Sequence, residues 1–103
     1  MDQLTSLYEV IASRKGGDAS SSYTASLFAK GMDRITQKCG EEAFETVIAA
    51  LHKNSQAVVA ESADLLYHLL VLWAELNIHP DEVMAELSRR EGVSGIAEKQ
   101  SRK

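Results

Sequence analysis

Two short stretches, Lys38–Glu45 (KCGEEAFE) and Glu61–Asp64 (ESAD), place five carboxylates inside segments whose pattern is otherwise helical and apolar. Residues three or four positions apart share one face of a helix, so each stretch gathers its acids on one side. An ionised carboxylate in apolar surroundings is costly unless a positive charge meets it. The pattern therefore predicts a helical fold arranged around an acidic site. Its acids are Glu41, Glu42, Glu45, Glu61 and Asp64.

The two acidic stretches are predicted to face each other across an antiparallel helix hairpin. Apolar periodicity predicts one long helix over residues 34–53 and another over residues 56–76, with Asn54 and Ser55 as turn and cap. Consecutive helices joined by a short turn are antiparallel neighbours. Glu45 lies nine residues before Asn54 and Glu61 lies seven residues after it, so both clusters fall at nearly the same level.

A cation is the favoured explanation of this acidic level. No Lys or Arg occurs in the second helix, so Glu61 and Asp64 have no local partner. One alternative is an ion pair with Arg34 or Lys38 across the hairpin. Because four or five acids at one level repel each other, a shared divalent ion compensates them better. Oxygen ligands of this kind select Mg²⁺, with Mn²⁺ as a possible substitute. The expected ligands are Glu42, Glu45, Glu61 and Asp64.

The rest of the chain is also predicted to be helical. A first amphipathic helix ends near Arg14, a short helix begins at Ser22–Thr24 and ends at Gly31, and Pro80 begins a last helix that Gly92 stops. Asp33 is expected to cap the long helix over residues 34–53. We therefore predict an all-α bundle of four to five helices in a single domain of residues 1–103, in which residues 92–103 form a polar C-terminal tail.

Three expectations concern packing. On the first long helix the apolar side opposite the acids is expected to pack into the core, and on the last helix one apolar side is expected to face inward. The second long helix is apolar at almost every angle, and a chain of 103 residues can hardly surround it. We therefore predict that a homodimer completes the core. The residues expected to face inward are Phe44, Val47 and Leu51 on the first long helix, and Val83, Met84 and Leu87 on the last.

Bulk properties narrow the function classes. The net charge of −4, from 11 basic and 15 acidic residues, argues against a protein that binds a nucleic-acid backbone. The longest apolar run, residues 65–74, is too short to cross a bilayer, and the N-terminus has no signal-peptide pattern. Cys39 is the only cysteine, which fits a reducing compartment. We expect a cytoplasmic protein without nucleic-acid or membrane partners.

The motifs K-x-G-E-E-A-x-E and E-x-x-D-L-L-Y-H-L resemble those of the phosphoribosyl-ATP pyrophosphatases of histidine biosynthesis, within the MazG-like all-α nucleoside triphosphate pyrophosphatases. Two flanking signatures extend the resemblance over roughly residues 4–102: Ser22-Tyr23-Thr24 with a following Gly31, and Ser94-Gly95 with Glu98-Lys99. The acidic pair alone indicates only the superfamily, whereas the flanking segments point to the histidine-pathway member.

The resemblance implies Mg²⁺-dependent hydrolysis of the α–β phosphoanhydride of a phosphorylated nucleotide, phosphoribosyl-ATP, to phosphoribosyl-AMP and pyrophosphate, with a functional link to phosphoribosyl-AMP cyclohydrolase. Glu41 or Glu45 is the candidate general base, and the motif leaves the choice open. The hydroxyls of Ser22 and Thr24 either bind phosphate or simply cap a helix. Catalytic candidates are Glu41, Glu45 and Lys38, and substrate-binding candidates are Arg34, Lys38, Ser22, Thr24 and Lys99.

Two other functions are compatible with the sequence. A broader (deoxy)nucleoside triphosphate pyrophosphatase would share the metal site and differ in the base pocket. A non-enzymatic helical interaction module would carry the acids only as a solvated surface. An enzyme and an interaction module differ in two observables: only the enzyme should be stabilised by Mg²⁺, and only the enzyme should release pyrophosphate.

Overall fold

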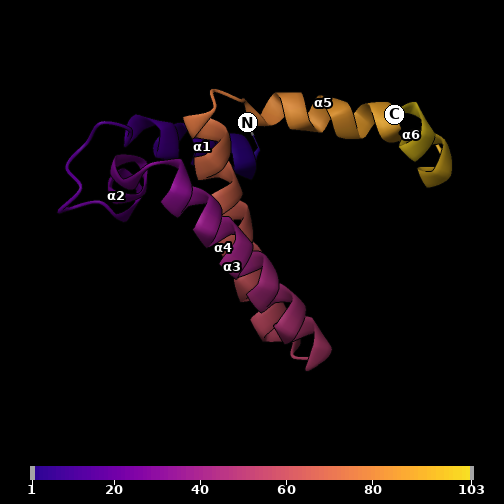
Figure 1. Ribbon diagram of the computed structural model, residues 1–103, viewed down its shortest axis with the longest axis horizontal. Coiled ribbons are helices and arrows are strands. Elements are labelled where there is room, and N and C mark those ends of the chain that lie inside the picture. Colours follow the sequence, from indigo (N-terminus) through magenta and orange to yellow (C-terminus); the bar gives the residue numbers. More distant parts are fainter. Residues whose placement is uncertain (1, 103) are drawn as a thin grey trace.

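The computed structural model describes residues 2–102, and over that range the chain forms six helices and no strand (Figure 1). The all-α prediction is confirmed, with one helix more than the four to five expected. The two terminal residues of the predicted domain, at positions 1 and 103, lie outside the described range. The helices are α1 (Gln3–Ser13), α2 (Tyr23–Lys30), α3 (Met32–Leu51), α4 (Ser55–Glu75), α5 (Pro80–Arg90) and α6 (Gly95–Ser101).

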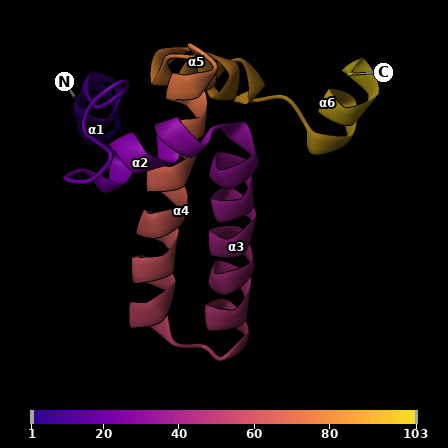
Figure 2. The same ribbon diagram turned by 60° about the vertical axis from the view of Figure 1, so that its left-hand side comes forward.

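The predicted hairpin is the central feature. Helices α3 and α4 run antiparallel and side by side over their whole length, joined by residues 52–54 (Figure 2). The short helices α1 and α2 lie at the end of the hairpin opposite this turn. The turn end of the hairpin therefore projects away from the rest of the chain, and only α3 and α4 cover each other there.

Local signals explain the helix ends. The side chains of Ser22 and Asn54 accept hydrogen bonds from backbone N–H groups in the first turns of α2 and α4, as their types predict. Gly31 separates α2 from α3 with φ 87° and ψ −172°, a conformation open essentially to glycine alone. The predicted cap at Asp33 is wrong: α3 begins at Met32, one residue earlier, and Asp33 lies in its first turn.

The hydrophobic core lies where α1 and α2 cover the hairpin. Its aliphatic side chains come from α1, α2, α3 and the C-terminal half of α4. Burial of such residues is the main stabilising contribution to a domain of this size. The core residues are Ile11, Leu27, Ile35, Leu70, Val71 and Ala74.

The apolar side of α3 does not pack into this core. In the single chain Phe44, Val47 and Leu51 are 66%, 53% and 73% exposed, which contradicts the prediction. Glu42 and Glu45 of α3 are turned toward α4 instead, and Glu42 is buried in the seam. On α5, Leu87 is exposed as well, so it does not face inward as expected.

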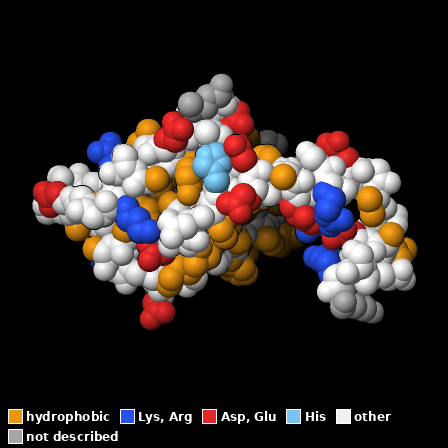
Figure 3. Space-filling model, turned by 90° about the horizontal axis from the view of Figure 1, so that it is seen from above, with side chains coloured by type: hydrophobic (Ala, Val, Ile, Leu, Met, Phe, Trp, Pro, Cys, Tyr) orange, Lys and Arg blue, Asp and Glu red, His pale blue; other side chains and the backbone are white. Residues whose placement is uncertain are grey.

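Within the predicted polar C-terminal tail, residues Gly95–Ser101 form helix α6. Ser94 caps α6, and the side chain of Glu98 is buried because both of its oxygens accept hydrogen bonds from Arg89 at 2.7 Å. Helices α5 and α6 together form an arm that extends from the bundle, with acidic and basic side chains crowded along its middle (Figure 3). The radius of gyration, 15.6 Å, exceeds the roughly 13 Å of a compact domain of this length.

Helix α4 is also long and apolar enough, by length and composition, to cross a membrane. The core helix of a soluble bundle meets the same criteria. Here α4 carries Glu61 and Asp64 in its middle and packs along α3, an arrangement that fits a bundle helix.

Candidate metal centre

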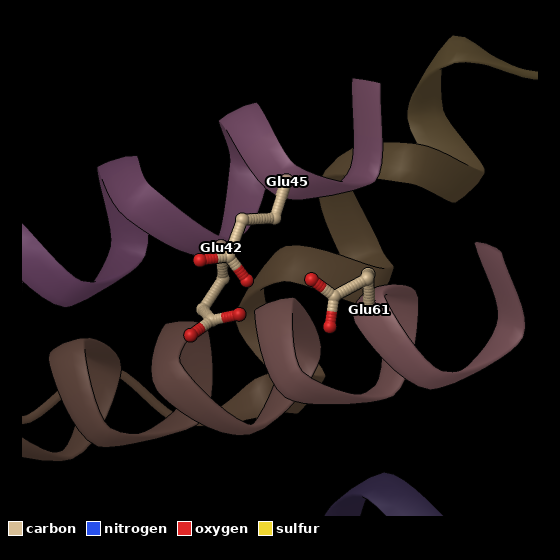
Figure 4. A group of neighbouring side chains, drawn as sticks. All are labelled: Glu42, Glu45 and Glu61. Carbon is tan, nitrogen blue, oxygen red and sulfur yellow. The ribbon is translucent and has the colours of Figure 1, made fainter. Parts of the chain in front are cut away.

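Three glutamates converge between α3 and α4. Glu42 and Glu45 lie one turn apart on α3, Glu61 projects from α4, and their carboxylates point toward one another (Figure 4). One oxygen from each lies within 4.8 Å of the others. Counting residues from the turn predicted this meeting level. A group of three carboxylate oxygens at such distances can hold one hard divalent cation.

Glu42 is the most enclosed member of the group. It is 7% exposed, and its Oε1 has no hydrogen-bond partner. Its other oxygen lies 3.7 Å from Nζ of Lys38, an ion pair that compensates part of the charge. A buried carboxylate oxygen without a partner is costly, and coordination of a cation would satisfy it. The residues present therefore fit a metal ion.

The electrostatics of the group agree with this interpretation. Burial, followed by the negative charges of Glu45 and Asp64, raises the pKa of Glu42 above its ordinary value. A hydrogen bond with Glu45, together with burial and the neighbouring acids, raises the pKa of Glu61 to about 7. Both pKa values rise because each carboxylate disfavours ionisation of its neighbours. A divalent ion would offset this repulsion.

Asp64, the fourth predicted ligand, is not part of the three-residue group. It is exposed and lies three residues beyond Glu61 on α4. Its charge still contributes to the raised pKa values of both Glu42 and Glu61, so it lies close to the group.

Glu41 occupies a different environment from its neighbour Glu42. It is exposed, and it accepts hydrogen bonds from Nε2 of Gln37 at 2.9 Å and from Nζ of Lys38 at 3.2 Å. These two bonds, with a smaller contribution from Arg34, lower the pKa of Glu41. The hydrogen bond to Glu41 in turn raises the pKa of Lys38. The basic residues of α3, Arg34 and Lys38, thus lie directly beside the acidic group.

The hydroxyl residues at the start of α2 both have structural partners. Ser22 accepts a hydrogen bond from the backbone N–H of Ala25, which is the capping role. The hydroxyl of Thr24 is hydrogen-bonded to the phenol of Tyr67 on α4. Lys99 is exposed on α6, at the outer end of the arm, and the single chain does not bring it to the acidic group (Figure 2).

One group near the site was missed by sequence reasoning. The phenol of Tyr23 lies 3.3 Å from Nε2 of His68, and the two residues are 45 positions apart in the chain. His68 itself was expected to be a hydrogen-bonding neighbour rather than a ligand, and its Nδ1 does bond the carbonyl oxygen of Asp64 at 2.9 Å. No local pattern links a residue of α2 to a residue of α4, so only the S-Y-T motif could have drawn attention to Tyr23.

An antiparallel hairpin with a seam of carboxylates and adjacent basic side chains defines an all-α protein whose residues could hold a divalent cation and an anionic ligand. Residues 4–91 match the family model described as phosphoribosyl-ATP pyrophosphohydrolase. Because the match covers most of the chain, the chain belongs to the phosphoribosyl-ATP pyrophosphohydrolase family. The family is one of hydrolases, so the chain is an enzyme rather than an interaction module.

Curated relatives agree over nearly the whole length. The chain is 62% identical over 99 residues to the phosphoribosyl-ATP pyrophosphatase of Paramagnetospirillum magneticum, covering 96% of this chain and 91% of the relative. It is 62% identical over 100 residues to that of Parvibaculum lavamentivorans, covering 97% and 92%. It is 54% identical over 101 residues to that of Geobacter metallireducens, covering 98% and 93%.

Proposed function

We propose that the chain hydrolyses phosphoribosyl-ATP to phosphoribosyl-AMP and pyrophosphate, the second step of histidine biosynthesis. Family membership and the names of its relatives support this substrate. The observation that carries the proposal is the convergence of Glu42, Glu45 and Glu61, with one buried oxygen left unpartnered. Such a site suits a polyphosphate, which binds proteins through a divalent ion.

Mg²⁺ is the proposed cofactor, and Mn²⁺ is a possible substitute. Glu42, Glu45 and Glu61 would hold the ion, and Asp64 would join them by a change of rotamer from its exposed position. When bound, the ion neutralises phosphate charge and lowers the pKa of a coordinated water. The chain is proposed to act as one domain over residues 1–103.

Lys38 and Arg34 are the proposed phosphate contacts. Lys38 forms ion pairs with both Glu41 and Glu42, so its ammonium is placed to donate hydrogen bonds to a phosphate that lies along the acidic group. Arg34 lies one turn farther along α3 and contributes to the lowered pKa of Glu41.

The general base is one of two glutamates. Glu41 lies outside the three-residue group, and its lowered pKa makes it the weaker base. Glu45 lies inside the group, with a carboxylate oxygen within 4.8 Å of one from Glu61. Replacing each by glutamine separates them: loss of the base removes the ascending limb of the pH–rate profile, whereas loss of a metal ligand raises the Mg²⁺ concentration needed for activity.

A homodimer is the proposed assembly. The turn end of the hairpin exposes apolar side chains on both of its helices, and a second copy offers the same surface with two-fold symmetry. Dimer formation would also allow Lys99 of one copy to approach the acidic group of the other. The exposed apolar residues on the hairpin are Phe44, Val47, Ile48, Leu51, Val59 and Leu66.

We further propose that the enzyme works in the cytoplasm, free of membrane and nucleic acid. Its product would be the substrate of phosphoribosyl-AMP cyclohydrolase, which gives the two enzymes a functional link.

The decisive experiment is identification of the products. The protein is incubated with Mg²⁺ and phosphoribosyl-ATP, and pyrophosphate and orthophosphate are measured separately. We expect pyrophosphate alone, and loss of its release in Glu42→Gln and Glu61→Gln. Glu9→Gln, an exposed acid on α1, is the matched control for the change in charge. Faster turnover of deoxynucleoside triphosphates than of phosphoribosyl-ATP would reject the proposed substrate.

A further inference from the structure

The polar groups along the α3–α4 seam change in character from one end to the other. Glu45 and Glu61 lie nearest the turn, Lys38 lies farther along α3, and His68 lies farther along α4. His68 is seven residues beyond Glu61, which places it about 10 Å along the axis of α4. Beyond His68 the seam is closed by Tyr23 at the start of α2. Along the seam, starting from the turn, the acidic group thus comes first, then Lys38, and then the aromatic residues at the α2 end.

His68 has both ring nitrogens engaged. It is 5% exposed, and its Nδ1 lies 2.9 Å from the carbonyl oxygen of Asp64. A carbonyl oxygen only accepts, so Nδ1 carries a proton, and in the tautomer whose single proton is on Nδ1 the Nε2 atom keeps a lone pair. The hydroxyl of Tyr23, 3.3 Å away, therefore donates to Nε2. This bond fixes the position of the Tyr23 ring from its hydroxyl end.

Tyr67 also contacts the ring of Tyr23, by stacking against it. The rings of Tyr23 and Tyr67 are stacked with centroids 6.4 Å apart and an angle of 22° between their planes. Tyr67 also packs edge-on against His68 at 4.9 Å, and its hydroxyl is hydrogen-bonded to Thr24. Few rotamers remain open to Tyr23 under these restraints.

Despite these contacts Tyr23 is 53% exposed. Its phenol also contributes to the raised pKa of Lys38, so the exposed ring lies near the proposed phosphate contact. An exposed aromatic ring that is held in one orientation beside a phosphate site offers a stacking surface for a nucleobase at little entropic cost.

We propose that the adenine ring of the substrate stacks on Tyr23, and that His68 is a positioning residue that holds Tyr23 for this contact. The inference rests on the proposed function and extends it by assigning the nucleobase end of the site. The row then has a consistent direction: phosphates lie along the acids and Lys38, and the base lies at the α2 end.

Kinetics of pyrophosphate release test the assignment. Stacking of a base on an aromatic side chain strengthens binding, and its loss in Tyr23→Leu should raise KM about tenfold to a hundredfold. kcat should change less than about threefold, because the contact is made equally before and during the reaction. Tyr23→Phe keeps the ring and should raise KM less than Tyr23→Leu does. If Tyr23→Leu changes kcat but leaves KM unchanged, or changes neither, the proposal is overturned.

The role of His68 is tested by coupling. His68→Leu removes the acceptor for the Tyr23 hydroxyl, and Tyr23→Phe removes the hydroxyl itself. If His68 acts through Tyr23, the double variant should have the KM of either single variant rather than the product of both effects. His68→Gln, whose side-chain oxygen can accept the same bond, should restore much of the wild-type KM. Multiplicative effects would show that His68 acts by another route.

Equilibrium binding separates this inference from the proposed function. AMP carries the base but has no anhydride, and ribose 5-phosphate lacks the base. Measured calorimetrically with Mg²⁺, Tyr23→Leu should weaken AMP about tenfold or more and leave ribose 5-phosphate unchanged. If the wild type fails to release pyrophosphate, the proposed function falls and the AMP result alone decides the inference. Equal weakening of both ligands, or no AMP binding by the wild type, overturns the inference.

Discussion

Replacing Glu42 by leucine should stabilise the metal-free protein while it destroys the metal site. Glu42 is 7% exposed with one oxygen unpartnered, so it adds a desolvated charge that the neighbouring acids Glu45 and Asp64 repel. Lys38 is not stranded by the change, because it keeps Glu41 at 3.2 Å. Replacing a whole buried ion pair by apolar residues is often neutral or stabilising by about 1–4 kcal/mol, and we expect about 1–2 kcal/mol here because the remaining partner stays paired.

Thermal melts with EDTA and with Mg²⁺ give the test. About 1–2 kcal/mol corresponds to an increase in Tm of roughly 5–10 °C for a domain of this length. Mg²⁺ at a hundred times its Kd stabilises the wild type by about 2.7 kcal/mol and should leave Glu42→Leu unchanged. The stability order of the two proteins therefore inverts when Mg²⁺ is added. A metal-free Glu42→Leu less stable than the wild type, or one that Mg²⁺ still stabilises, would refute the reasoning.

Three further outcomes are expected. The pKa of Glu61 is raised to about 7 from an ordinary 4.5, so between these pH values the folded state holds a proton that the unfolded state has lost. The free energy of unfolding of the metal-free protein should therefore fall as pH rises from about 4.5 to 7 and level off above, which thermal melts at a series of pH values would show. Gly31→Ala should destabilise the protein by about 1–3 kcal/mol in urea titrations, because φ 87° strains any residue with a Cβ even though nothing within 4 Å would touch that atom. Glu98→Ala removes the carboxylate through which α6 is bonded to Arg89 of α5 and should abolish hydrogen-exchange protection in α6 while α3 and α4 keep theirs.

Local signals were sufficient to predict the hairpin and its acidic level. Helix periodicity, the Asn54 cap and a short turn fix two antiparallel helices, and residue counting then brings Glu45 opposite Glu61. Periodicity does not say which face of a helix meets its neighbour. For α3 the usual rule failed: Glu42 is buried against α4, and Phe44 on the other side is exposed. A site that needs carboxylates inside the seam can override the preference for apolar burial.

Contacts between distant residues were beyond sequence reasoning. Helix α6 is held by the pairing of Glu98 with Arg89 on the preceding helix, whereas the polar composition of residues 92–103 predicted only a polar tail. Tyr23 and His68 meet only because α2 packs across the end of α4. In both cases the sequence contains the residues but not the path that brings them together.

The two faces of α3 make metal binding and dimer formation separable. All three carboxylates of the metal group come from a single chain, whereas Phe44 and its apolar neighbours lie on the opposite face. Phe44→Glu should therefore give a monomer in light scattering that Mg²⁺ still stabilises against heat. If Lys99 of a second copy completes the site, that monomer should also show a raised KM, matched by Lys99→Ala in the dimer. A monomer that no longer responds to Mg²⁺ would mean that the acids depend on the partner for their arrangement, contrary to the convergence seen within one chain.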